Sequence, residues 1–403
     1  MLLKNRERMI VVQSFVYQAP TKVIFGKEAE LQVPVEAKER GCSRIFLVYG
    51  GGSVIKSGLL ARMEECIEAA GLSVKSFGGV QPNPRLQLAR QGVKQAIAFQ
   101  ADLILAVGGG SVIDTAKFIA IGVANPETDI GDFWLYKQRV TKTLPVATVL
   151  TIAAAGSETS DSAVLTDEET NTKRGINYDL IRPAFSALNP ELTMTLPKYQ
   201  VACGIVDMMM HTMDRYFNPV VTNEVTDEIA EAILRVIIRN GTKAMADPHD
   251  YQAVSELMWA GSLSHNGLTG LGGAKDFAPH QLGHELSGKF DVAHGASLSV
   301  MWGFWALYTR RTDPERFARF GRNVWGLTGS TEDVSLAAIE AANAYFRSLD
   351  MPTNFTELGI GVQPDEVIEE LALRCSFYDK RTIGSFQALN RQDITAIYHM
   401  ANH

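Results

Sequence analysis

The stretch ADLILAVGGGSVIDTAK, residues 101–117, places a continuous apolar run directly before three glycines and a helical pattern. Ala101–Val107 is predicted as a buried strand, because a strand that is covered on both faces is apolar throughout. Gly108–Gly110 would let the backbone approach an anion closely, and the free N–H groups of the following helix would face it. The pattern predicts a phosphate-binding turn, although such a turn also occurs without a ligand.

The segments on either side of this stretch extend the same pattern. Further strands are predicted at Arg44–Gly50, Ser73–Phe77 and Pro145–Ile152, with helices at Ser57–Ala70 and Arg85–Gln100. Apolar strands that alternate with helices of this length indicate a parallel sheet covered on both faces. The first part of the chain, residues 1–190, is therefore predicted to be an α/β dinucleotide-binding domain with a Rossmann-like sheet.

From Leu196 onward the sequence shows only helical periodicity. The predicted helices are Lys198–Phe217, Asn223–Ala246, Tyr251–Asn266, Phe277–Phe290, Ser297–Arg311, Pro314–Gly326, Asp333–Leu349, Pro364–Tyr378 and Arg391–Ala401. Segments rich in glycine, proline or aspartate separate them, as expected between helices. Residues 191–403 are predicted to form an all-α domain.

Composition excludes several classes of protein. The chain has 403 residues, 46% of them hydrophobic, and a net charge of −7 without a basic run, so nucleic acid is not an expected partner. Its four cysteines are scattered, which excludes a disulfide framework and favours the cytoplasm. The longest apolar stretch, residues 296–308, is shorter than the ~20 residues that cross a bilayer, so no membrane association is expected.

A second glycine turn follows the strand Arg44–Gly50. Gly50–Gly52, Ser53 and Lys56 occupy the position at which NAD-binding folds commonly carry an acid for the adenosine ribose. A carboxylate there would repel a 2′-phosphate, and its absence favours NADP(H) over NAD(H). The alternative is that this loop is an ordinary surface turn.

Five side chains in the helical part have spacings suited to a metal. Asp207 and His211 are four residues apart on one predicted helix, His280 and His284 repeat that spacing on another, and His294 follows. Three imidazoles and one carboxylate can hold a divalent cation and leave a position open for substrate. Either pair can also arise incidentally, and the spacing does not decide which four residues are ligands.

Four segments together resemble the iron-containing (group III) alcohol dehydrogenases. They are GGGSVIDTAK at 108–117, AGSETSDSAV at 155–164, GIVDMMMHTMDRY at 204–216 and DFAPHQLGHELSGKFDVAHG at 276–295. YGGGSVIKSG at 49–58 and Pro82–Pro84 are similar to the NADPH-dependent aldehyde reductase and butanol dehydrogenase branch. The resemblance spans nearly the whole chain and implies a dehydroquinate-synthase-like architecture, with the active site between the two domains.

The resemblance also implies a role for each candidate residue. It makes Asp207, His211, His280 and His294 the ligands of one divalent metal, Fe²⁺ or Zn²⁺, and leaves His284 as a catalytic histidine near the substrate. It implies that the cofactor is held by two glycine turns and a neighbouring threonine: Gly51, Gly52, Ser53, Gly109, Gly110, Ser111 and Thr151. Two positions depart from the family pattern, Ala155 in place of threonine and Asn189 in place of aspartate.

The expected activity is interconversion of simple alcohols and aldehydes such as butanal by hydride transfer. A phosphorylated substrate would need several basic residues around the metal, and only Arg215, Lys275 and Lys289 lie near the ligand segments in sequence. The alternatives are a glycerol or polyol dehydrogenase, a dehydroquinate-synthase-like lyase, or a non-catalytic metal- or nucleotide-binding protein. The β-rich segment Ser14–Phe25 could offer an unpaired sheet edge, which favours a homodimer over a hairpin packed on its own domain.

Overall fold

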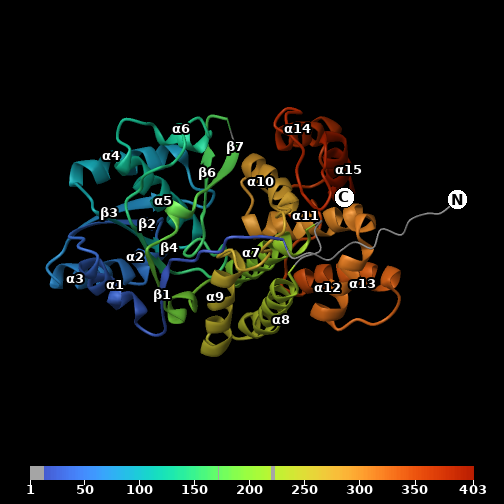
Figure 1. Cartoon of the computed structure of the whole chain (residues 1–403), viewed down its shortest axis with the longest axis horizontal. Coiled ribbons are helices and arrows are strands. Elements are labelled where there is room, and N and C mark those ends of the chain that lie inside the picture. The colour runs from blue at the N-terminus through green and yellow to red at the C-terminus, as the bar shows by residue number, and fades with distance from the viewer. Residues whose placement is uncertain (1–12, 171, 219–222) are drawn as a thin grey trace.

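The computed structural model describes residues 13–170, 172–218 and 223–403. The α/β part, blue to green in Figure 1, contains the sheet, and the helical part, yellow-green to red, lies beside it. This arrangement confirms the predicted fold class. None of the described helices combines the length and the hydropathy needed to span a membrane.

Six parallel strands form the main sheet of the α/β part. In spatial order they are β1 (Lys22–Phe25), β8 (Phe185–Leu188), β5 (Val146–Leu150), β4 (Leu103–Gly108), β2 (Arg44–Gly50) and β3 (Ser73–Val80). Every residue of β4 is buried, as its unbroken apolar sequence predicts. The short strand β8 was not among the predicted strands. β1 pairs with β8 and forms one edge of the sheet, and β3 forms the other.

Helices cover both faces of this sheet. They are α1 (Val33–Glu39), α2 (Ser53–Lys56), α3 (Leu59–Ala69), α4 (Leu86–Phe99), α5 (Gly110–Ala124) and α6 (Ile130–Trp134). Leu105 of β4 packs in the same cluster as Val33 of α1 and Met63 of α3. Its neighbour Ile104 packs with Ala96 of α4 and Ile119 of α5. Successive residues of a strand point to opposite faces, so one apolar run fills both layers.

An antiparallel hairpin, β6 (Ser162–Asp167) and β7 (Thr172–Asn177), leaves the α/β part beside the main sheet. It lies between α5 and α10 in Figure 1, at the junction with the helical part. No strand was predicted here, because residues 162–177 mix polar and charged residues without a long apolar run.

The helical part follows the predicted pattern closely. Its helices are α7 (Lys198–Tyr216), α8 (Glu224–Ala246), α9 (Tyr251–His265), α10 (Ala278–Phe290), α11 (His294–Thr309), α12 (Pro314–Trp325), α13 (Thr331–Ser348), α14 (Asp365–Cys375) and α15 (Arg391–Ala401). Most ends agree with the prediction to within two residues. α11 begins three residues earlier than expected, which places His294 in its first turn.

The departure at Asn189 has a structural consequence. The Asn189 side chain accepts a hydrogen bond from the Glu191 backbone N–H at 3.1 Å and donates one to the buried Glu30 carboxylate at 3.0 Å. An aspartate would retain the first contact and place a second negative charge beside Glu30. The amide therefore suits this environment better than an acid.

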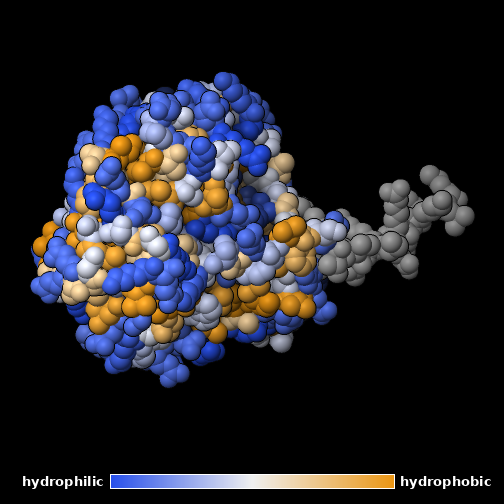
Figure 2. Space-filling view, turned by 60° about the vertical axis from the view of Figure 1, so that its left-hand side comes forward, coloured by the Kyte–Doolittle hydropathy of each residue, from blue (hydrophilic) through white to orange (hydrophobic). Residues whose placement is uncertain are grey.

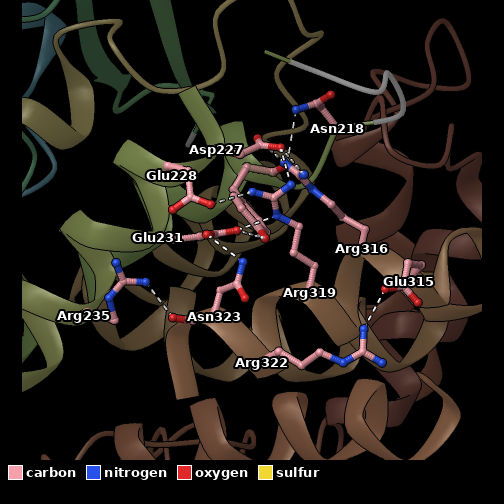
Figure 3. A network of polar contacts seen from close by, with 11 residues as sticks. Asn218, Asp227, Glu228, Glu231, Arg235, Glu315, Arg316, Arg319, Arg322 and Asn323 are labelled. Atoms are coloured by element: carbon pink, nitrogen blue, oxygen red, sulfur yellow. Dashed lines mark hydrogen bonds and ion pairs between the residues drawn. The ribbon is translucent and has the colours of Figure 1, made fainter. Parts of the chain in front are cut away.

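A buried ionic network joins the end of α7 to α8 and α12 (Figure 3). Glu231 is fully buried and accepts hydrogen bonds from Tyr216, Arg319 and Asn323 at 2.7–2.9 Å. Arg316 makes a two-pronged contact with Asp227 at 2.6 and 2.7 Å. These bonds offset the cost of burying charge and fix the C-terminal end of α7.

We expect Arg319→Ala to destabilise the protein by about 3 kcal/mol, because it removes one of three donors to a buried carboxylate. Arg322→Ala on the same helix is the control, because the partner of Arg322, Glu315, is 64% exposed. Loss of this surface ion pair should lower the free energy of unfolding by no more than about 1 kcal/mol. Urea denaturation of both variants measures the difference. Equal losses would show that Glu231 does not depend on Arg319.

Candidate metal and cofactor site

Four candidate ligands converge from three helices of the helical part. Asp207 and His211 lie one turn apart on α7, His280 is on α10, and His294 is the first residue of α11. The Nε2 atoms of His211, His280 and His294 lie 3.3, 3.6 and 3.8 Å from Asp207 Oδ1. Asp207, His280 and His294 also form a group whose ligand atoms all lie within 4.8 Å of one another. The structure thus brings Asp207, His280 and His294 into one group and places His211 beside it, with Nε2 3.3 Å from Asp207 Oδ1.

The hydrogen bonding of these atoms fits a cation. Asp207 Oδ1 and His280 Nε2 are buried and have no hydrogen-bond partner among the described residues. Leaving such atoms unpaired is costly, and a bound cation would satisfy them. Ligand atoms about 2.1 Å from one ion in a tetrahedron lie about 3.4 Å apart, which is close to the three separations from Asp207 Oδ1 to the imidazole nitrogens. Three nitrogens and one oxygen are a suitable donor set for Fe²⁺ or Zn²⁺.

Close packing sets the position of His294. A Cβ atom on the next residue, Gly295, would lie 2.3 Å from the Cys203 carbonyl oxygen of α7. Only glycine therefore permits the start of α11 to approach α7 this closely. The contact places His294 beside Asp207, one turn along α7 from Cys203.

Two buried carboxylates orient His280. Asp214 Oδ2 accepts a hydrogen bond from His280 Nδ1, which leaves Nε2 to face Asp207. Asp276 accepts bonds from the backbone N–H groups of Ala278 at 2.9 Å and of Phe386 at 2.8 Å, and so anchors the start of α10. Burial, and then the nearby Asp214, raise the pKa of Asp276 to about 7.

The histidines of the site differ in charge preference. Burial, followed by the neighbouring His265 and His280, lowers the pKa of His211 well below its usual range. Burial and Lys173 do the same for His294. For His280, burial opposes protonation, but Asp214 and Asp207 outweigh it and raise the pKa. Neutral imidazoles are the form that binds metal.

His284 lies beside this cluster without joining it. Its ring centroid is 5.1 Å from that of His294 and 6.1 Å from that of His280. Burial and then Lys173 lower the pKa of His284 well below its usual range. Lys173 reaches the site from β7, where its Nζ donates to Asn83 Oδ1 at 3.0 Å. Burial lowers the pKa of Lys173 to about 8, with Asp207 opposing that shift.

The predicted cofactor residues lie on three adjacent strand ends. Gly51, Gly52 and Ser53 follow β2, Gly109, Gly110 and Ser111 follow β4, and Thr151 follows β5. The Thr151 backbone N–H donates to the Gly108 carbonyl at 3.1 Å. Strand order reverses between β2 and β4, and ligands of open α/β sheets bind at such a reversal.

The turn after β4 provides a suitable cradle for phosphate. α5 begins at Gly110, and no side chain caps its first turn. A Cβ atom on Gly109 would lie 3.0 Å from the Ile152 side chain, and one on Gly110 would lie 3.1 Å from Ala155 Cβ. Larger residues would fill this space and cover the N-terminal N–H groups that can bind an anion.

Sequence reasoning missed three residues of the site: Asp214, Lys173 and His265. Asp214 is seven residues from Asp207 on α7, so helical periodicity could have placed it on the same side of the helix. Lys173 and His265 carry no such signal, because only the hairpin and the end of α9 bring them to the site. Basic residues near the metal were therefore undercounted. Lys289, which was counted, instead pairs with Glu370.

The chain matches two family models, "Iron-containing alcohol dehydrogenase" over residues 20–190 and "Fe-containing alcohol dehydrogenase family, C-terminal" over residues 201–402. It is 40% identical to the "NADH-dependent butanol dehydrogenase A" of Clostridium acetobutylicum, covering 96% of this chain and 98% of that one. It is 34% identical to the "NADPH-dependent aldehyde reductase YqhD" of Escherichia coli, covering 87% and 90%.

Solved structures show the same architecture. The crystal structure of an NADH-dependent butanol dehydrogenase A from Thermotoga maritima superposes with a TM-score of 0.93 at 32% identity, covering 97% of this chain and 99% of that one. The crystal structure of Escherichia coli YqhD gives a TM-score of 0.91 at 32% identity, with the same coverage.

We expect His280→Ala and His294→Ala each to lose stoichiometric metal and turnover while the α/β part stays folded. Loss of a residue that only hydrogen-bonds a ligand lowers metal affinity by ~10–100-fold, and loss of the ligand itself should lower it further. His284→Ala is the matched control and should keep its metal but lose rate. Metal analysis by mass spectrometry, with circular dichroism for folding, measures these effects. Full metal in His280→Ala, or none in His284→Ala, would contradict the assignment.

Proposed function

This chain belongs to the iron-containing alcohol dehydrogenase family and is an alcohol/aldehyde oxidoreductase, and on that premise we propose that it interconverts simple alcohols and uncharged aldehydes such as butanal with NADP(H). One observation supports the proposal most. Three imidazole nitrogens surround a buried carboxylate oxygen that has no hydrogen-bond partner among the described residues, at the junction between the strand-end turns and the helical part.

Asp207, His211, His280 and His294 would hold one Fe²⁺ or Zn²⁺ ion. When bound, such an ion acts as a Lewis acid that stabilises negative charge on the substrate oxygen. Asp214 keeps His280 in the orientation that directs Nε2 to the ion. The hydride belongs to the nicotinamide, and the protein contributes position and charge.

His284 is the proposed proton carrier. Its lowered pKa keeps the ring neutral at pH 7, so a ring nitrogen can accept the proton that an alcohol releases on oxidation. The same nitrogen returns that proton to the substrate oxygen in the reductive direction. Lys173, a nearby cation, disfavours a second positive charge on this ring and so supports the neutral form.

Preference for NADP(H) rests on the turn after β2. Residues 50–56 contain no carboxylate, Ser53 can donate a hydrogen bond to a 2′-phosphate, and Lys56 is exposed nearby. The relatives include proteins named for NADH and for NADPH, so the family alone does not decide the preference. The local absence of an acid favours the phosphorylated cofactor.

Gly51→Asp should weaken NADPH binding and shift preference toward NADH, because the new carboxylate opposes the 2′-phosphate. A Cβ atom at position 51 meets nothing within 4 Å, so the substitution should fold. The expected change in the ratio of kcat/KM values is about ten- to hundredfold, the value of one charge-assisted hydrogen bond. Gly51→Asn is the uncharged control. Equal kcat/KM for both cofactors in the unmodified enzyme would contradict the proposed preference.

An uncharged substrate is favoured by the immediate surroundings of the ligands. The Phe277 ring lies 5.2 Å from the His280 ring and 6.1 Å from the His211 ring. The guanidinium of Arg215 is buried and stacks on Phe277 at 4.9 Å, and so is covered by the ring. Lys173 is a further cation that the structure adds to those expected near the ligands from the sequence. Loss of NADPH absorbance with butanal indicates an aldehyde reductase, and gain of that absorbance from NADP⁺ with glycerol indicates a polyol dehydrogenase. No change with either substrate indicates a non-catalytic binder.

The proposed assembly is a homodimer or larger oligomer. β1 lies at the sheet edge, and residues 13–20 before it are exposed, with Val16 at 93%. The face seen in Figure 2 carries several groups of hydrophobic residues between hydrophilic ones. An unpaired edge next to an exposed apolar segment favours pairing with a second copy.

Light scattering at micromolar concentration should therefore give the mass of at least two chains. Val16→Lys and Tyr17→Lys together should shift the protein toward the monomer, since charge disfavours burial of this segment. A monomer mass for the unmodified protein would contradict the proposal.

Two further expectations remain predictions. One is the division of the chain into domains 1–190 and 191–403. The other is a cytoplasmic location, which rests on the pattern of cysteines.

A further inference from the structure

His211 lacks the support that His280 receives. Its Nδ1 atom is buried and has no hydrogen-bond partner among the described residues, whereas His280 Nδ1 bonds Asp214. Histidines that bind metals usually donate this second N–H to a carboxylate, a carbonyl or a water, and that bond fixes the ring. His294 Nδ1 is likewise buried without a partner among the described residues, so the orientation of both rings depends on packing.

The neighbouring ring of His265 packs against the ring of His211. The two ring centroids are 3.9 Å apart with an interplanar angle of 30°, which is a stacked arrangement. His265 is the last residue of α9, which packs beside α7, and it is only 6% exposed. Stacking restricts rotation of the His211 ring about its side-chain bonds.

His265 is in turn bound to the α/β part. Its Nδ1 donates to the Ala155 carbonyl oxygen at 2.6 Å. The next residue, Gly156, has φ +63°, and a Cβ atom there would lie 2.6 Å from the Gly261 carbonyl and 2.7 Å from His265 Cβ. Thr159 Oγ1 donates to the Ser262 carbonyl at 3.0 Å. We call residues 153–160 the bridging loop, because it is packed directly on the end of α9.

The bridging loop also belongs to the proposed nucleotide site. Gly110, at the start of α5, packs closely on Ala155 of this loop. A Cβ atom on Gly110 would lie 3.1 Å from Ala155 Cβ. Further along α5, buried Lys117 donates to the carbonyls of Ser157 at 2.7 Å and Ser160 at 3.0 Å. Asp114 accepts a bond from Ser157 Oγ at 2.6 Å. The loop is thus attached to the helix whose N-terminus would hold the phosphates.

We propose that His265 is a positioning residue that holds the ligand His211 and transmits nucleotide binding to the metal site through the bridging loop. The inference rests on the proposed metal and cofactor sites. Ordering of the loop by nucleotide would reduce the freedom of Ala155, of His265 and then of His211. Such a link is reciprocal, so bound nucleotide should strengthen metal binding by the same factor that bound metal strengthens nucleotide binding.

Chelator competition tests the proposal with the full-length apoprotein, Co²⁺ and NADP⁺. In the unmodified protein, saturating NADP⁺ should lower the Kd for Co²⁺ by a factor of about 5–150, the range of typical couplings. His265→Phe keeps a ring on His211 but removes the bond to Ala155, so this factor should fall below about two. His265→Leu also removes the stack, and its Kd without nucleotide should rise about tenfold or more.

His249, which is exposed just before α9, provides the control. His249→Phe should retain the coupling factor of the unmodified protein. The visible absorption of bound Co²⁺ gives a second measurement, since addition of NADP⁺ should shift the band in the unmodified protein and not in His265→Phe. This comparison is available even if His265→Leu does not fold.

The possible failures are distinguishable. If the unmodified protein binds neither Co²⁺ nor NADP⁺, the proposed function and this inference both fail. If it binds both with a coupling factor of one, or if His265→Phe keeps the full factor, the inference alone is overturned.

Discussion

The arrangement of the helical part depends on one buried oxygen atom. Asp207 Oδ1 lies away from water, has no hydrogen-bond donor among the described residues, and is surrounded by three imidazole nitrogens. A carboxylate in this setting is costly unless a cation offsets its charge. The crossing of α7, α10 and α11, with Gly295 against α7, is what brings these ligands together. Asp214 and the network around Glu231 then fix α10 and the end of α7.

The three imidazoles are held in different ways. His280 is oriented by a carboxylate, His211 by a stacked ring, and His294 by its place at the start of a closely packed helix. Their surroundings differ accordingly, because the carboxylates raise the pKa of His280 while burial lowers those of the other two. A site built in this way combines one strongly oriented ligand with two that depend on helix packing.

The chemistry belongs to the junction between the two parts of the chain. The α/β part contributes three turns at adjacent strand ends, the hairpin that carries Lys173, and the bridging loop that meets α9. The helical part contributes the proposed ligands and His284. Hydride transfer requires the nicotinamide and the substrate carbonyl to meet in a fixed geometry, and in the proposed reaction the contacts across this junction would set that geometry. The replacement of threonine by Ala155 fits this view, because position 155 contributes its backbone carbonyl.

The sequence by itself determined the local units of this protein. The apolar run of Ala101–Val107 and the glycine turn after it indicated a buried strand and an anion site, and helical periodicity located each helix from α7 to α15. The spacing of Asp207 and His211 placed two candidate ligands on one helix face, and the family resemblance implied the proposed set of four. These features depend on residues close together in the chain, for which periodicity and turn chemistry are sufficient.

Only the tertiary structure decided which distant segments meet. The short strand β8 and the polar hairpin have weak patterns of their own and are formed by their neighbours. Lys173, His265 and the Ala155 carbonyl reach the site through packing between segments that are far apart in sequence. His265 carries no pattern that distinguishes a core histidine from one that holds a metal ligand. That distinction arises from the 3.9 Å stack on His211, which exists only when α7 and α9 lie side by side.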